Sequence, residues 1–267
     1  MKILTIARNT FSSFLRDKLI ILFCILFACV VLMMMTPLMR LKAMTSAAND
    51  QQMQSYVLSV VASIMSLVSG CGSMLAAWAA ADTVAAEMKS GTILAVMARP
   101  VRRWEFLAGK YLGVMLLMTV YVFMMFGLSY LLAWMGGEKI QSTPWVLLVY
   151  PLVRYAIYSA ATVLLVTVMH PVLASAAVMT ISVAASVIDP GQHYASLFWT
   201  WAHHAAYAIL PSTTLLSEQR FLVITHATLK QTTWVEHLIT LAYGLDYALV
   251  CLLLAMWSFH YRTLERD

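Results

Sequence analysis

The chain has 267 residues, of which 62% are hydrophobic and only 11% are charged. A soluble domain carries charge on roughly a quarter of its residues, so this chain has too little charge to cover a surface that faces water. The mean hydropathy of +0.81 agrees. The composition excludes a soluble globular enzyme, a disordered chain and a nucleic-acid-binding protein, and it predicts a multi-pass membrane protein surrounded by lipid.

Six apolar segments are each long enough to cross about 30 Å of hydrocarbon as a helix. In chain order they are Leu19–Met39, Tyr56–Ala81, Tyr111–Met135, Trp145–Met169, Val172–Ile188 and Leu238–Trp257. His170-Pro171 separates the fourth from the fifth, because proline lacks the N–H that would continue a helix. Only helices and closed barrels satisfy the backbone in lipid, and these runs are too long for barrel strands. The sequence therefore predicts an all-α protein with six transmembrane helices.

The segments outside the six spans complete a single transmembrane domain, residues 1–267. It divides into an N-terminal helix (1–18), the first two spans (19–81), a cytoplasmic loop (82–110), the next three spans (111–188), an external segment (189–237), the sixth span (238–257) and a tail (258–267). The external segment is apolar from Tyr194 to Leu210 but carries two central histidines, which predicts a re-entrant or interfacial helix rather than a seventh span.

Residues 1–18 have the pattern of an amphipathic helix. The apolar residues Leu4, Ala7, Phe11, Phe14 and Leu15 recur at helical spacing, between polar positions. Such a helix would lie in the plane of the lipid headgroups before the chain enters the first span. The alternative is an ordinary charged anchor in front of that span.

The basic residues predict the orientation of the chain. Most of the 17 Lys and Arg residues lie in the N-terminal segment, the 82–110 loop and the tail, which share one side of a six-span topology. Because cytoplasmic loops are enriched in Lys and Arg, both termini are expected in the cytoplasm. We also expect the membrane to be a bacterial inner membrane.

The 82–110 loop carries a short apolar helical pattern that Pro100 must end or kink. The order of the residues in and around this helix resembles the cytoplasmic loop of ABC-2 type permeases. These residues are Glu87, Gly91-Thr92, Arg99-Pro100, Arg103 (or its neighbour Arg102) and Gly109-Lys110. These permeases are the membrane subunits of one class of ABC transporters. The N-terminal helix is similar to the elbow helix of that family, and the likeness covers essentially the whole chain.

The resemblance implies that residues 89–99 form a coupling helix that docks on a separate cytoplasmic ATPase subunit. Apolar residues would supply contact and charged residues would fix the register. The coupling residues are then Glu87, Gly91, Thr92, Ile93, Leu94, Met97, Arg99, Pro100 and Arg103. The alternative for the charged ones is that they only flank the spans and bind headgroups.

The chain lacks a nucleotide-binding motif, so ATP hydrolysis is expected on a separate subunit. Gly109-Lys110 is followed by tyrosine, and Trp104 stands where a phosphate-binding loop needs its first glycine. We therefore expect that the chain binds no cofactor and is no enzyme itself, and that ATP and Mg²⁺ bind two copies of the partner ATPase. A second permease copy or a paralogue is expected to complete the pathway, with export as the direction.

Two charges and two glycines stand out inside the spans. Arg154 and Asp246 both lie roughly 12 to 14 Å from the outer face, near the middle of the membrane, and we hypothesise an ion pair that is either structural or lines the pathway. Gly70 and Gly72 lie in a second span rich in small residues, which favours close helix packing or a bend.

Two other functions remain open at this point: a membrane-embedded enzyme that acts on lipid, and a scaffold that does not transport. The enzyme would rely on His203, His204, Glu218 or Asp246, but these residues form no recognisable acid–base cluster. His193, His203, His204 and His226 also lack a recognisable zinc spacing, so no metal site is expected.

Cysteine labelling tests the predicted orientation. In a chain whose own four cysteines are replaced by alanine, Lys139→Cys and Glu218→Cys should react with a membrane-impermeant maleimide on whole cells. Ala95→Cys and Glu265→Cys should react only after the cells are opened. Labelling of Ala95→Cys from outside would overturn the orientation, and with it the cytoplasmic coupling helix.

Overall fold

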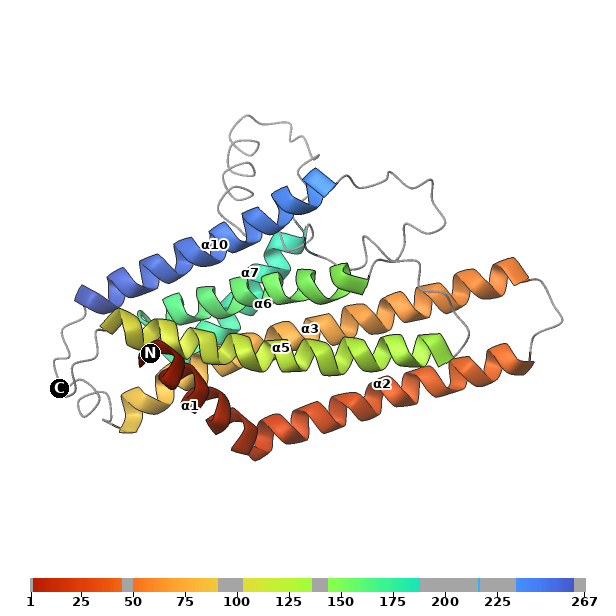
Figure 1. The fold of residues 1–267 in the computed structure, drawn as a ribbon, viewed down its shortest axis with the longest axis horizontal. Coiled ribbons are helices and arrows are strands. Elements are labelled where there is room, and N and C mark those ends of the chain that lie inside the picture. Colours follow the sequence, from red (N-terminus) through yellow and green to blue (C-terminus); the bar gives the residue numbers. More distant parts are fainter. Residues whose placement is uncertain are drawn as a thin grey trace.

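The computed structural model describes residues 2–44, 50–90, 103–135, 144–187, 216 and 234–261, and these segments form seven α-helices without a strand (Figure 1). The helices are α1 (Lys2–Arg16), α2 (Lys18–Met44), α3 (Asp50–Ser90), α5 (Arg103–Met135), α6 (Pro144–Val166), α7 (Pro171–Val187) and α10 (Trp234–Tyr261). The predicted all-α class is confirmed for this part of the chain.

Four of the helices are long and apolar enough to cross a membrane. These stretches are Ser66–Ala85 in α3, Trp104–Leu128 in α5, Leu148–Val166 in α6 and Trp234–Ser258 in α10. They correspond to the second, third, fourth and sixth predicted spans. The first and fifth predicted spans fall in α2 and α7, whose described apolar stretches are shorter, Ile20–Met33 and Pro171–Ala184. The structure thus supports a multi-pass membrane protein, while the count of six spans stays a prediction.

The 82–110 segment is helical at both of its ends. Helix α3 continues to Ser90 and α5 begins at Arg103, so both helices extend beyond the predicted span boundaries. The reason is local: residues 79–86 include five alanines, the residue with the highest helix propensity. Residues 91–102, which hold most of the predicted coupling helix, lie outside the described residues.

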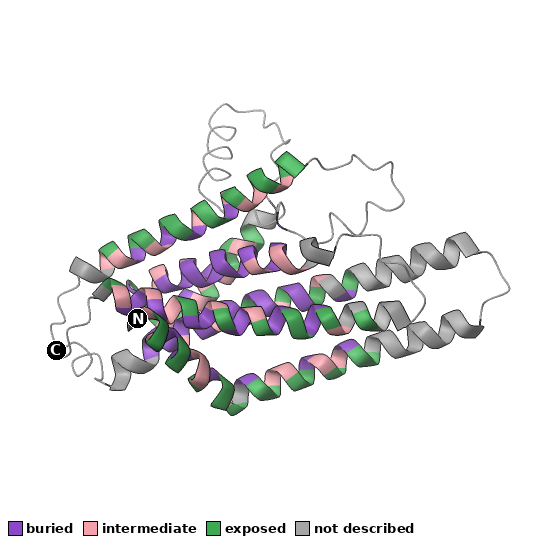
Figure 2. Cartoon of the chain, viewed as in Figure 1, coloured by how far each residue is buried: buried purple, intermediate pink, exposed green. Residues whose placement is uncertain are grey.

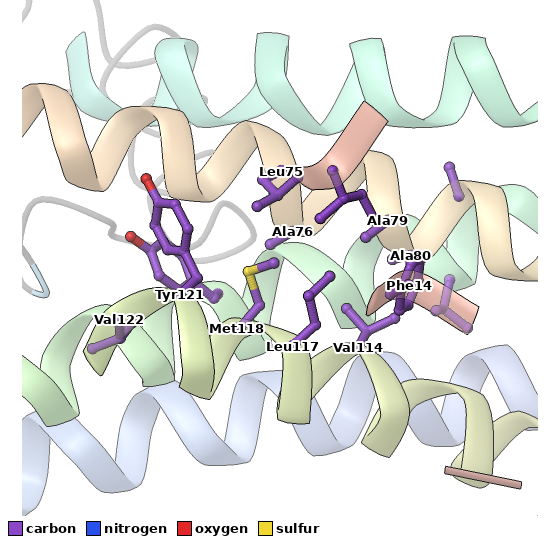
Figure 3. Close-up of a cluster of buried hydrophobic side chains, with 14 of the residues drawn as sticks. Phe14, Leu75, Ala76, Ala79, Ala80, Val114, Leu117, Met118, Tyr121 and Val122 are labelled. Atoms are coloured by element: carbon purple, nitrogen blue, oxygen red, sulfur yellow. The ribbon is translucent and has the colours of Figure 1, made fainter. Parts of the chain in front are cut away.

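Helices α3, α5 and α6 form the centre of the bundle, and α10 lies at its rim. In an apolar stretch of 18 residues within the α6 span 72% of the residues are buried, against 22% in the corresponding stretch of the α10 span. Figure 2 shows the buried residues gathered on α3, α5 and α6 and exposed residues along the outer side of α10. Small side chains allow close contact in the centre: the alanines of α3 face Val114, Leu117 and Met118 of α5 (Figure 3).

Helix α1 packs against the start of α5 through two glycines of α5. A Cβ atom added to Gly109 would lie 2.8 Å from Cβ of Ile6, and one added to Gly113 would lie 2.6 Å from Cβ of Thr10. Residues four apart share one face of a helix, so Gly109 and Gly113 form a notch in which α1 lies. We call this contact the glycine notch.

The apolar residues of α1 share one side of the helix, and only part of that side is buried against the bundle. Ala7 and Phe14 are buried with Thr10 in the contact with α5, whereas Leu4 and Leu15 are 75% and 50% exposed. The apolar face thus has a buried side, which serves the glycine notch, and an exposed side. The helix itself is present, and its location at the membrane surface stays a prediction.

Substitutions by alanine test the glycine notch. Gly113→Ala places a methyl group inside the contact with Thr10 and should cost about 1–3 kcal/mol of stability through overpacking. Gly127→Ala is the matched control on the same helix, since nothing lies within 4 Å of the position of its Cβ. Thermal unfolding of the two purified variants in detergent measures the difference. Equal midpoints would show that α1 does not depend on the notch.

Candidate functional site

Two tyrosines join the three central helices. The hydroxyl of Tyr121 on α5 donates a hydrogen bond to the carbonyl of Val68 on α3, at 2.9 Å. The hydroxyl of Tyr155 on α6 donates to the carbonyl of the next residue, Ser69, at 3.3 Å. The two rings meet edge to face with their centroids 6.2 Å apart, and both side chains are buried. We call this arrangement the tyrosine joint.

Gly72 makes room for the tyrosine joint. A Cβ atom at this position would lie 2.6 Å from a ring carbon of Tyr121 and closer still to the hydroxyl of Tyr155. Gly70, two residues earlier, is exposed, and nothing lies within 4 Å of the position of its Cβ. The two glycines that the sequence analysis names together thus have different surroundings: Gly72 lies at a close contact and Gly70 on an open face. A bend at either of them stays a prediction.

Hydroxyl groups add further bonds to the backbone of α3. The hydroxyl of Ser73 donates to the carbonyl of Ser69 at 3.0 Å, so that this carbonyl accepts from both Ser73 and Tyr155. The hydroxyl of Thr83 donates to the carbonyls of Ala79 and Ala80. Such bonds compete with the helical hydrogen bonds and often bend a helix. This arrangement positions helices, and none of these groups is set up for acid–base chemistry.

Helix α6 is joined by side-chain hydrogen bonds to all of its neighbours. Apart from the tyrosine joint, these bonds are Tyr111 to the carbonyl of Ala156 (3.3 Å), Tyr150 to Nδ1 of His237 (2.7 Å), Tyr158 to Ser182, and Thr167 just after α6 to Ser258 (3.0 Å). They reach α5, α7 and both ends of α10. Because these bonds and the tyrosine joint connect α6 to α3, α5, α7 and α10, we describe α6 as the central helix of the described bundle.

The structure does not bring Arg154 and Asp246 together. Arg154 is 9% exposed on α6, whereas Asp246 is exposed on α10. Helix α10 turns Gly244 and Ala248 toward α6, where a Cβ on Gly244 would lie 3.6 Å from Cδ1 of Ile157 and closer to Val153. Asp246 follows Gly244 by two residues, about 200° around the helix. Equal depth therefore does not place the two charges on facing sides.

Most of the predicted coupling residues lie outside the described part of the chain. Glu87 belongs to the last turns of α3 and Arg103 is the first residue of α5, but the structure describes neither side chain. The others are Gly91, Thr92, Ile93, Leu94, Met97, Arg99 and Pro100. The histidines and Glu218 of the external segment are also outside. Among the described residues no group of three His, Cys, Asp or Glu could hold a metal ion.

The sequence analysis missed the tyrosine joint and the glycine notch. Both had a signal: a tyrosine inside an apolar span needs a partner for its hydroxyl, and Gly109-x-x-x-Gly113 has the spacing of a close helix contact. The partner helix could not have been identified in either case, because spacing within one helix does not say which other helix lies against it.

The helices described above fall within the part of the chain that matches a known protein family. The family model described as ABC-2 family transporter protein matches residues 4–264, from α1 through α10. No curated protein matches the chain.

The two glycines of α3 provide a test of the tyrosine joint. Gly72→Ala should lose about 1–3 kcal/mol, because the tyrosine rings must move, whereas Gly70→Ala should be neutral or slightly stabilising. Tyr121→Phe should lose about 1 kcal/mol, the contribution of one hydrogen bond. Thermal unfolding in detergent measures all three. If Gly72→Ala is as stable as Gly70→Ala, the joint does not hold the helices.

Proposed function

Because the chain belongs to the ABC-2 transporter family, we propose that it is the permease subunit of an exporter, forming the substrate pathway as a dimer and driven by a separate cytoplasmic ATPase. The observation that carries this proposal is the family match over nearly the whole chain. Proteins of this family are membrane components of transport and work with an ABC ATPase. The apolar spans of α3, α5, α6 and α10 support the membrane part of the proposal.

In this proposal the ATPase acts on residues 91–102, which connect α3 to α5. These two helices lead from that connection to the tyrosine joint, roughly 30 Å away at 1.5 Å per residue. A movement of the connection would therefore reach the centre of the bundle along two helices whose far parts are hydrogen-bonded to each other. The tyrosine joint would make the two helices respond as one unit. Glu87 and Arg103 lie where the helices meet the ATPase.

Arg154 is the candidate for a charged contact along the pathway. It is buried on α6, between the bonds that Tyr150 and Tyr158 make to α10 and α7. An ion pair with Asp246 would require α10 to turn about its own axis during transport, so we propose the pathway role for Arg154 rather than a permanent bridge. Cytoplasmic termini remain part of the proposal, since they rest on the charge distribution. A location in a bacterial inner membrane is also part of the proposal.

ATP turnover of the purified permease–ATPase complex tests the proposal. In liposomes, the wild-type permease should change the turnover of the ATPase. Glu87→Ala and Arg103→Ala should reduce that effect at least about tenfold, which corresponds to the loss of roughly 1.4 kcal/mol of docking energy. Glu236→Ala, near the opposite end of the bundle, is the matched control and should behave as the wild type. If the ATPase has the same ATP turnover with and without the permease, the proposed coupling is contradicted.

A further inference from the structure

Asp246 lies at the middle of a membrane span and on its outer side. It is the central residue of the span Trp234–Ser258 and is exposed. Exposed residues continue above and below it at spacings of four and three residues: Ile239, Ala242, Asp246, Leu249, Leu253 and Trp257. We call this stripe the Asp246 face. It runs along the side of α10 that turns away from α6, where Figure 2 shows exposed residues.

The Asp246 face combines two features of a contact between helices. Steps of three and four residues, which alternate from Ile239 to Leu253, are compatible with one helix lying along another in a left-handed pair. A charged group in the centre of such a stripe is unfavourable against lipid tails, and charged residues within spans usually face a protein interior or an opposite charge. Any exposed face of a helix has this spacing, so it is the central charge that sets the Asp246 face apart from an ordinary lipid-facing surface.

Among the residues that the structure describes, no basic residue is placed to reach this carboxylate from a second copy. In the described spans, Lys110 lies near one end of its span and Arg154 is the only Lys or Arg near the middle. Arg154 is buried in α6 and would have to leave the bundle. Two copies that met symmetrically through this face would bring two Asp246 carboxylates together, and like charges repel. The described spans therefore point to a base on another polypeptide.

We propose that the Asp246 face docks a transmembrane helix of another polypeptide that carries a Lys or Arg at its midpoint. Asp246 pairs with this base, while Leu249 and Leu253 pack against the apolar side chains of the partner helix. Ala242, one turn before Asp246, leaves space for the partner's backbone to approach. In this arrangement the carboxylate determines which helix binds, as a single polar residue in an apolar seam does in coiled coils.

A synthetic helix serves as the probe for this proposal. Full-length permease with a fluorescent donor at its C-terminus is reconstituted in phosphatidylcholine vesicles with an acceptor-labelled, leucine-rich peptide of one span. The peptide with a central lysine should bind the wild type about tenfold more tightly than the all-leucine peptide, as measured by energy transfer. Asp246→Asn should abolish this preference.

Two control variants separate the charge and its position from the fold. Leu249→Asn changes the polarity of the same face one turn away and should keep the preference for lysine. The double variant L245D/D246L moves the acid about 100° around the helix at nearly the same depth, off the Asp246 face, and should lose it. Both exchanges concern exposed side chains, so the variants are expected to fold like the wild type.

Several outcomes would overturn the proposal. Equal binding of the two peptides to the wild type, or an unchanged preference in Asp246→Asn, would show that no base is recognised. Energy transfer between donor- and acceptor-labelled permeases that disappears in Asp246→Asn would assign the face to a second copy. If R154D/D246R folds while each single variant does not, the partner of the acid is within the chain. None of these outcomes depends on coupling to an ATPase.

Discussion

Two phenol hydroxyls in the middle of the bundle lie out of reach of water, and the carbonyls of Val68 and Ser69 satisfy both of them. Inside a membrane a polar group without a partner costs several kcal/mol, so these bonds fix how far α5 and α6 slide along α3 and how they are rotated. Gly72 allows the approach. The remaining hydrogen bonds of α6 then place α7 and α10 relative to this centre, and the other described contacts follow from it.

The sequence predicts those structural features that depend on a single segment, such as the position of a helix. Hydropathy locates four spans because lipid imposes the same requirement on every residue of a span, and the spacing of Leu4, Ala7 and Phe14 predicts α1. The sequence does not predict contacts between helices, because these depend on which side of a helix faces which neighbour. Arg154 and Asp246 share a depth, but depth contains no information about rotation, and the small Gly244 is what turns α10 toward α6.

The contrast between α6 and α10 matters for function. Helix α6 is hydrogen-bonded to neighbours on every side, whereas among the described residues α10 is hydrogen-bonded to the bundle near its two ends, by His237 and Ser258. Between these ends one side of α10 packs against the bundle through apolar contacts at Gly244, Ala248 and Cys251. The outer side of α10 makes no packing contact with the described bundle. Residues there are under no packing constraint from the described bundle, so a carboxylate on that side is better explained by a contact outside the chain than by stability.

The glycine notch has a consequence for biosynthesis. A ribosome makes α1 first, but Gly109 and Gly113 emerge only after α2 and α3 have been translated. At about 5–20 residues per second, the nascent helix waits several seconds for the surface on which it finally lies. During that delay the residues that later face the notch, Ala7 and Phe14, are as uncovered as Leu4 and Leu15 are in the finished bundle. Helix α1 can pack against the glycine notch once the third span has been inserted.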